Sequence, residues 1–326
     1  MTRWVQYVSQ GERRLGFAVG DRVADLAGVR RAMAFRRGHR GARLDRLVER
    51  VAPRELSELL ALGDLGTALV GEAQDWLAGL GAGESAELVR DGVLRDLASL
   101  SYAPAVSPTA TVYCVGFNYA AHAAEAGASV SAHPELFIRG HESLAGHGQP
   151  IVRPAVSEML DFEAELAVVI GTPCHRVAAP EARSFVAGYA NLNEGSIRDY
   201  QKHSPFPTAG KNFPASGSMG PWVVTADEVP DPQDLTITTT VDGEVLQSAH
   251  TSDMIFAVDA LVAYISEFTV LQPGDVISTG TPSGIGFRRT PQRFLRPGET
   301  VAVEFSGLGR LENPIVAEPD TEGARA

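Results

Sequence analysis

The chain has 326 residues, 44% of them hydrophobic, and carries a formal net charge of −12. A chain of this length forms one large or two modest domains and has enough apolar sequence for a real core. Its negative charge argues against nucleic acid or an anionic membrane as a partner. No apolar run reaches the length of a bilayer span and the N-terminus lacks a signal-peptide pattern, so we expect a cytoplasmic protein.

The first hundred residues predict small packing elements without chemistry. Short strands are expected at residues 4–9 and 15–19. An arginine-rich stretch at residues 30–43 could be a nucleic-acid patch, but in an acidic chain a solvated helix or loop is the better interpretation. Apolar residues at helical spacing then predict helices near residues 44–51 and 69–80.

A proline-containing connector at residues 102–108 predicts two domains. The first is a small N-terminal domain at residues 1–105, and the second is a catalytic domain at residues 106–326. From Thr111 onwards the sequence changes to strands, turns and clustered polar residues, so we expect the chemistry to lie in the second domain.

At residues 118–125 a loop enters a short helix that carries His122 and Glu125. Because they are three residues apart, the two side chains share a helical face and lie within reach of each other. A carboxylate that orients an imidazole and raises its basicity is a general-base arrangement, although such pairs also occur on ordinary surfaces. The small and polar residues 127–133 that follow are a candidate mobile lid.

A short acidic run, Asp161-Phe162-Glu163-Ala164-Glu165, precedes an apolar strand. Alternate side chains of a strand share a face, so Asp161, Glu163 and Glu165 are expected to project together. Carboxylates spaced roughly 7 Å apart repel one another, and a hard divalent cation such as Mg²⁺, Mn²⁺ or Ca²⁺ removes that repulsion. An edge strand with a solvated acidic face is the alternative.

A dense polar cluster follows the apolar strand expected at residues 186–193. Glu194 can supply a third carboxylate to the cation, with Arg198 and Gln201 expected one and two turns along the same helical face. Lys211 lies in a loop rich in proline and glycine. A lysine there is ordinarily on the surface, but near an anionic substrate it becomes an electrophilic donor.

The rest of the chain predicts mostly strands, with an apolar helix at residues 255–268. The glycine-rich loop at residues 280–286 is neither a Walker A motif nor a dinucleotide fingerprint, so we expect no organic cofactor. The H-E-x-x-H spacing of zinc proteases and the G-x-S-x-G elbow of serine hydrolases are not met. Cys114 and Cys174 lack metal-site spacing, so both are expected to be reduced and structural.

Together these residues resemble the fumarylacetoacetate hydrolase family. The resemblance runs in order over about residues 107–316, and the first hundred residues resemble a variable small domain that many members carry. The matching stretches are Gly116-Phe117-Asn118-Tyr119 with His122 and Glu125, Leu160-Asp161-Phe162-Glu163-Ala164-Glu165-Leu166, Gly188-Tyr189 through Arg198-Asp199 and Gln201, Gly210-Lys211, Gly220-Pro221-Trp222, and Pro273-Gly274-Asp275 with Gly280-Thr281-Pro282.

The resemblance implies a mixed α+β fold, mainly β, with a β-sandwich roll as the C-terminal domain and a small α+β N-terminal domain. It also implies a homodimer and a Mg²⁺ or Mn²⁺ site, with Ca²⁺ as a further option. By similarity the metal ligands are Glu163, Glu165 and Glu194, the last in place of an aspartate that is common in the family. This departure puts the choice of substrate in more doubt than metal binding, and Asp161 is expected to have a structural role.

The resemblance also implies roles for the other polar residues. His122 and Glu125 match the family's H-x-x-E dyad, and Thr281 matches a position that can contact a substrate carboxylate. The remaining matches are substrate-facing polar residues, namely Arg198 and Gln201 in binding and Lys211 in catalysis.

The expected function is metal-dependent hydrolysis of a C–C bond in a small acylpyruvate or other 1,3-diketo acid. His122, held by Glu125, deprotonates a water, while Lys211 and Gln201 stabilise the oxyanion. Decarboxylation of oxaloacetate-like 2-oxo acids and keto–enol isomerisation are alternatives, because family members of all three kinds exist. A non-catalytic protein that binds a metal or a small acid is a further alternative.

Overall fold

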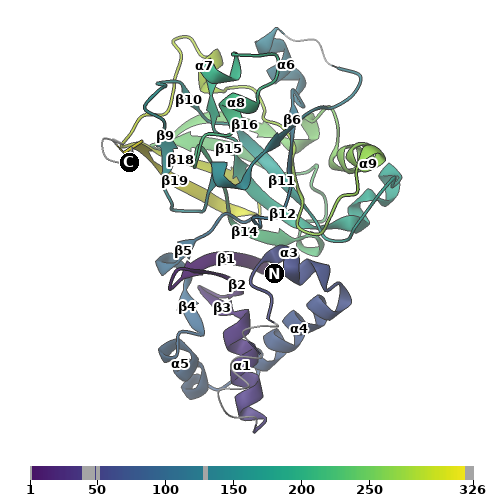
Figure 1. Cartoon of the computed structure of the whole chain (residues 1–326), viewed down its shortest axis with the longest axis vertical. Coiled ribbons are helices and arrows are strands. Elements are labelled where there is room, and N and C mark those ends of the chain that lie inside the picture. The colour runs from purple at the N-terminus through teal and green to yellow at the C-terminus, as the bar shows by residue number, and fades with distance from the viewer. Residues whose placement is uncertain (1, 39–47, 49–51, 128–130, 320–326) are drawn as a thin grey trace, which may run out of the picture.

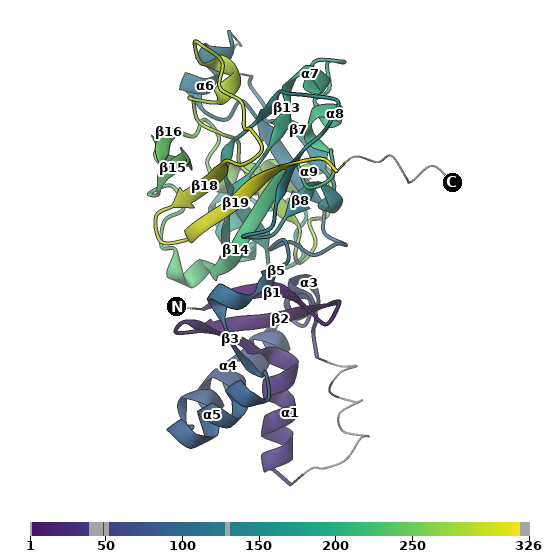
Figure 2. The ribbon, with the colours of Figure 1, turned by 90° about the vertical axis from the view of Figure 1, so that its left-hand side faces the viewer.

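The computed structural model describes residues 2–38, 48, 52–127 and 131–319. Figures 1 and 2 show a larger, strand-rich body above a smaller body that is formed by the N-terminal strands and helices. The fold is mixed α+β with strands predominating, as expected. Among the described residues, no helix is both long and apolar enough to cross a bilayer. The domain boundary expected at residue 105 stays a prediction.

In the N-terminal body, antiparallel strands pair in the order β4-β3-β2-β1, and helices lie along one side of them (Figure 2). The strands expected at residues 4–9 and 15–19 are confirmed. The arginine-rich stretch is helical as far as Arg36, whereas residues 39–43, and the helix expected at 44–51 except Val48, lie outside the described residues. The elements are β1 (Arg3–Ser9), β2 (Glu12–Val19), β3 (Arg22–Asp25), α1 (Leu26–Arg36), α3 (Leu56–Ala61), α4 (Asp64–Ala78), α5 (Ala82–Arg90) and β4 (Leu94–Asp96).

The same sheet continues without a break into the larger body. Strand β1 pairs with β14 in antiparallel register, with Arg3 opposite Val224 and Trp4 opposite Val223, and the order then runs β14-β12-β11-β17-β6-β7. Short strands β5 and β8 pair with β1 and β14. The bounds are β5 (Ser101–Tyr102), β6 (Val112–Gly116), β7 (Glu135–Arg139), β8 (Leu144–Ala145), β11 (Ala164–Ile170), β12 (Val186–Asn193), β14 (Gly217–Thr225) and β17 (Val276–Ser278).

A second sheet in the order β16-β15-β18-β19-β9 packs on the first. The helix expected at residues 255–268 begins at Val258, because Asn118 binds the backbone N–H groups of Ile255 and Phe256. The elements are β9 (Ile151–Arg153), β15 (Thr236–Val241), β16 (Glu244–His250), β18 (Thr300–Phe305), β19 (Gly309–Ala317) and α9 (Val258–Phe268), with the pair β10 (Leu160–Asp161) and β13 (Ser196–Ile197) beside them. Short helices are α6 (Ala120–Ala126), α7 (Arg198–Gln201) and α8 (Thr208–Lys211), and 3-10 turns are η1 (Leu97–Ser99), η2 (His141–Ser143), η3 (Ala179–Phe185), η4 (Ala226–Glu228), η5 (Thr251–Asp253) and η6 (Gly286–Arg288).

Strand β11 is buried on both faces and divides the core into two clusters. Leu166 and Val168 pack with Ile237 of the second sheet. Ala167 and Val169 point the other way, into a cluster that reaches the N-terminal body. Strand β11 therefore holds Glu165 between two apolar layers, where its side chain has little freedom to move.

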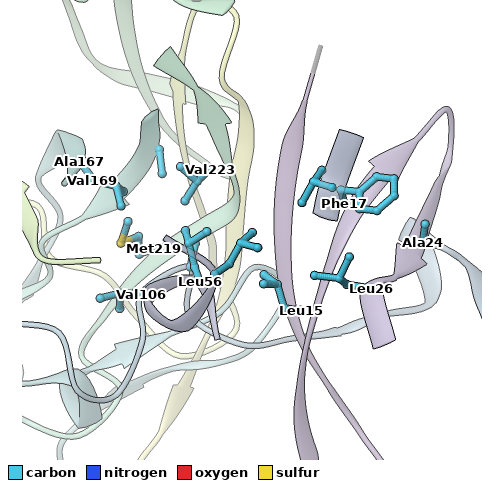
Figure 3. Packing of buried hydrophobic residues seen from close by; sticks show 14 of the residues in the cluster. Leu15, Phe17, Ala24, Leu26, Leu56, Val106, Ala167, Val169, Met219 and Val223 are labelled. Carbon is cyan, nitrogen blue, oxygen red and sulfur yellow. The ribbon is translucent and has the colours of Figure 1, made fainter. Parts of the chain in front are cut away.

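Leu56 of α3 lies between the two bodies in that second cluster, near Met219 on one side and Leu15 on the other (Figure 3). It is 2% exposed. We expect Leu56→Ala to lower the free energy of unfolding by about 2–5 kcal/mol, because the lost burial and the remaining cavity both count against the folded state. Chemical denaturation followed by circular dichroism measures this. Leu65→Ala is the control, since Leu65 is 60% exposed and should change stability little; equal effects from both variants would contradict the packing described.

Candidate active site

A cavity of ≈ 680 Å³ opens between β6, β7 and the ends of β11 and β12. Apolar walls from residues such as Phe137 and Ile285 surround a small set of charged groups. All site residues expected from the sequence line this cavity, except Glu125: they are His122, Glu163, Glu165, Glu194, Arg198, Gln201, Lys211 and Thr281.

The register of two paired strands brings Glu163, Glu165 and Glu194 together. Ala164 of β11 stands opposite Asn193 of β12, so the residues beside them meet at the same end of the sheet. The backbone N–H of Glu194 donates to the carbonyl of Glu163 at 2.9 Å, which fixes this corner. One carboxylate oxygen from each glutamate lies within 4.8 Å of the others, and all three side chains are buried.

Two buried cations compensate for this charge. Lys211 Nζ donates to Glu163 Oε2 at 2.9 Å and to Glu194 Oε2 at 3.1 Å, and Arg198 Nη1 lies 2.6 Å from Glu163 Oε1. Burial raises the pKa of Glu163, but Lys211 and Arg198 outweigh it, and the pKa lies well below its usual range. Burial lowers the pKa of Lys211, and the two glutamates outweigh that effect, so this lysine stays charged.

Among the described residues, no such cation is in direct contact with Glu165. Ser278 Oγ and the backbone N–H of Gly280 donate to its Oε2 at 2.5 and 2.8 Å. Burial, followed by the charges of Glu194 and Glu163, raises the pKa of Glu165 well above its usual range. Without a further positive charge, the glutamate trio therefore favours a proton on Glu165.

The donor set fits a hard divalent cation. All three groups offer oxygen ligands, which Mg²⁺, Mn²⁺ and Ca²⁺ prefer. Within the described part of the chain, Glu194 Oε1 is a buried acceptor without a hydrogen-bond donor, which is costly unless another group binds it. The trio could hold a metal ion and would gain the missing positive charge from it.

The expectation that Asp161 shares one strand face with Glu163 and Glu165 is wrong. Strand β10 ends at Asp161 and β11 begins only at Ala164, so the alternation is interrupted between them. Asp161 instead accepts from Arg198 Nε at 2.8 Å and from the backbone N–H groups of Gly286 and Phe287 at 2.8 and 2.9 Å. It thereby holds Arg198 against Glu163 and fixes the loop at the other wall of the cavity.

The expected helix from Glu194 to Gln201 is also wrong in its first part. Glu194 follows β12, the pair Ser196–Ile197 is strand β13, and α7 begins only at Arg198. Gln201 nevertheless reaches the site, because its Oε1 accepts from Arg198 Nη1 at 2.9 Å. Lys211, which would ordinarily lie on the surface, is buried at the end of α8.

His122 and Glu125 face each other on α6, with 3.5 Å between Nδ1 and Oε2. Glu125 Oε2 also accepts from the backbone N–H of Gly284 at 3.4 Å, and Phe117 stacks on the imidazole with ring centroids 5.6 Å apart. Burial lowers the pKa of His122, Glu163 raises it and Arg198 lowers it, with a net downward shift. The imidazole is therefore neutral near pH 7 and able to accept a proton. In the lid expected at residues 127–133, residues 128–130 lie outside the described part of the chain.

Two buried polar residues near the site were missed by sequence reasoning. Gln247 of β16 binds Thr281 Oγ1 at 3.0 Å from the second sheet, and nothing in its local pattern indicates this contact. Arg139 of β7 donates to the Gly195 carbonyl at 2.9 Å, beside Glu194. The other residues of β7 are exposed or half-buried, whereas Arg139 is 1% exposed, and the local sequence does not indicate this difference.

Residues 111–316 match the family model of the fumarylacetoacetate (FAA) hydrolase C-terminal region. The 4-hydroxyphenylacetate degradation bifunctional isomerase/decarboxylase of Salmonella dublin is 41% identical over 214 residues, which are 65% of this chain. The matched part is 48% of that relative, so the chain spans about half of its length. The mitochondrial oxaloacetate tautomerase Fahd2a of Rattus norvegicus is 38% identical over 215 residues, 66% of this chain and 68% of the relative.

A solved structure matches nearly the whole chain. Maleylpyruvate hydrolase from Sphingobium sp. SYK-6, in complex with manganese (II) ion and pyruvate, has a TM-score of 0.72 and 25% identity, and the match covers 97% of this chain and 100% of that one. Because the family model covers more than half of the residues, the chain belongs to the fumarylacetoacetate hydrolase family.

Proposed function

We propose that this chain is a divalent-metal-dependent enzyme that hydrolyses a C–C bond in an acylpyruvate or another 1,3-diketo acid. The observation that carries the proposal is the lining of one cavity, which holds both a neutral histidine paired with a carboxylate and a trio of buried glutamates. A base and a metal site in one cavity can act on two different carbons of one substrate. The family includes hydrolases, isomerases and decarboxylases, so the reaction itself is our proposal.

In the proposed mechanism Glu163, Glu165 and Glu194 hold Mg²⁺ or Mn²⁺, with Ca²⁺ as a further option. The ion, when bound, supplies positive charge that stabilises an enolate of the 2-oxo acid. Arg198 and Thr281, which both line the cavity, bind the substrate carboxylate. Lys211 and Gln201 donate to the carbonyl oxygen on which negative charge develops.

His122 is the proposed general base. Glu125 orients the ring through Nδ1, and Nε2 takes a proton from water, whose oxygen attacks the distal carbonyl carbon. The C–C bond then breaks, and its electron pair passes to the 2-oxo fragment as an enolate. That fragment recovers the proton from the imidazolium, so the products are pyruvate and a second carboxylic acid.

A second candidate reaction is decarboxylation or keto–enol isomerisation of an oxaloacetate-like acid. The relatives from Salmonella dublin and Rattus norvegicus, which are named for these activities, favour it with 41% and 38% identity. Neither reaction needs an attacking water. In isomerisation His122 would move a proton between carbon and solvent. A protein that only binds a metal or a small acid would not need His122.

The oligomeric state, the location in the cell and the domain boundary are proposals as well. We propose a homodimer in the cytoplasm, with a small N-terminal domain at residues 1–105 and a catalytic domain at residues 106–326.

The reaction type is tested by incubating the protein with Mg²⁺ or Mn²⁺ and either acetylpyruvate or oxaloacetate. We expect pyruvate and acetate from acetylpyruvate, identified by NMR, and no turnover after treatment with EDTA. Carbon dioxide from oxaloacetate without cleavage of acetylpyruvate would contradict the hydrolase and support the decarboxylase. Enol–keto exchange alone would support the isomerase.

The metal ligands are tested by Glu163→Gln. The change removes one negative charge from the trio, so we expect Mn²⁺ affinity in calorimetry to fall on the order of 100-fold, with turnover lost. Glu135→Gln is the matched control, because Glu135 lines the same cavity outside the trio. If Glu163→Gln keeps both Mn²⁺ affinity and turnover, the proposed site is wrong.

The general base is tested by His122→Gln, with His141→Gln as a control outside the cavity. We expect kcat to fall by about 10²–10⁴-fold while pyruvate affinity is kept. In the wild type kcat/KM should rise with pH as the imidazole loses its proton, and burial places this rise below the usual histidine range of about 6.5. A non-catalytic binding protein would show no activity to lose. If kcat/KM of His122→Gln still rises with pH as in the wild type, His122 is not the base.

A further inference from the structure

The side-chain amide of Gln247 connects the two sheets at the site. Gln247 is 1% exposed. Its Oε1 accepts from the backbone N–H of Ala164 at 3.0 Å and from Thr239 Oγ1 at 2.8 Å. Its Nε2 donates to Thr281 Oγ1 at 3.0 Å and to the Pro282 carbonyl at 3.0 Å. All four hydrogen-bonding positions of the amide are therefore used.

The backbone fixes which way this amide points. The N–H of Ala164 can only donate, so the atom facing it has to be the amide oxygen. The carbonyl of Pro282 can only accept, so the atom facing it has to be the amide nitrogen. Two independent backbone groups thus exclude the flipped amide, in which the oxygen and nitrogen would exchange places.

A fixed amide also fixes the polarity of the Thr281 hydroxyl. Because Thr281 Oγ1 accepts from Gln247, its own hydrogen points elsewhere. Thr281 lines the cavity, and among the described residues its hydroxyl has no protein acceptor in hydrogen-bonding range. Thr281 is 3% exposed, and a buried hydroxyl that still has a hydrogen to donate can form that hydrogen bond with a ligand in the cavity.

We infer that Gln247 is a positioning residue that makes Thr281 a hydrogen-bond donor toward the cavity, so that this subsite takes an acceptor oxygen of the ligand. The ligand's identity as a 2-oxo acid rests on the proposed function, and its matching atom is then a carboxylate or carbonyl oxygen. The same amide holds Ala164, which lies between Glu163 and Glu165. One side chain therefore sets the distance between the glutamate trio and the donor that faces the ligand.

The glycine-rich loop reinforces this arrangement. Gly284 has a φ of +99°, and a Cβ there would lie 2.7 Å from the Leu246 carbonyl, the residue before Gln247. Only glycine lets the loop lie this close to β16. The loop that carries Thr281 is consequently held against β16 on both sides of Pro282.

The test measures binding of pyruvate to the Mn²⁺-loaded protein by calorimetry, which does not depend on turnover. We expect Thr281→Val to weaken pyruvate about 10-fold, because a hydrogen bond to a charged group is lost, and Thr281→Ser to keep the affinity. Gln247→Met should also weaken pyruvate. If it acts through Thr281, it should have no further effect in the Thr281→Val background.

Two results overturn the inference. One is equal pyruvate affinity in Thr281→Val and the wild type, and the other is additive loss of pyruvate affinity in a double variant whose Mn²⁺ affinity is unchanged, since a loss transmitted through Ala164 would also change Mn²⁺ affinity. Asn313→Leu is the matched control, since Asn313 is a buried amide of the same sheet that donates to the Gly146 and Gln149 carbonyls at 2.7 Å each. It should lower stability without changing pyruvate affinity.

Further measurements distinguish this inference from a damaged metal site and from a failure of the proposed function. Mn²⁺ affinity should be unchanged in Thr281→Val, which removes no ligand. If Gln247→Met does not fold, Gln247→Glu takes its place, because it keeps an acceptor for Ala164 and removes the N–H donor to Thr281. Wild-type protein that binds pyruvate without cleaving acetylpyruvate contradicts the proposed hydrolase and leaves this inference standing, whereas wild-type protein that binds Mn²⁺ but no pyruvate contradicts the inference.

Discussion

The site depends on the balance between three buried carboxylates and two buried cations. Isolated charges of one sign are not stable in an apolar interior, so Glu163, Glu165 and Glu194 can share a corner only if positive groups join them. Lys211 and Arg198 do so, and each brings the short helix that carries it against the sheet. Electrostatic compensation thus holds the charged part of the cavity lining together.

Much of the site could be predicted because its pattern is local. Alternation predicted Glu163 and Glu165 together, and they do meet although β11 begins only at Ala164. The H-x-x-E spacing on a helix predicted His122 against Glu125, which the structure also shows. Asp161 could not be placed in this way, because the alternation holds only while the strand continues and β10 ends at that residue. Local spacing therefore predicts contacts within an element but not the point at which the element stops.

Contacts between distant segments could not be derived from local pattern. Lys211 has the sequence context of a surface residue, and only the cluster of glutamates around it explains its burial. Gln247 lies 83 residues from its partner Ala164 and comes from the other sheet. The residues alone suggested Glu194 as a ligand and left Lys211 as an ordinary surface residue or a donor, and the family resemblance favoured their site roles because it carries tertiary information that spacing lacks. A buried amide such as Gln247 needed the fold.

The continuous sheet gives the N-terminal body a consequence beyond the site. Residues 111–316, which match the family model, do not include β1, the strand that pairs with Val223 and Val224 of β14. A chain reduced to that segment would present an open strand edge next to Met219, and such edges template pairing with other molecules. The first strand therefore covers an edge that would otherwise be open to pairing with other chains.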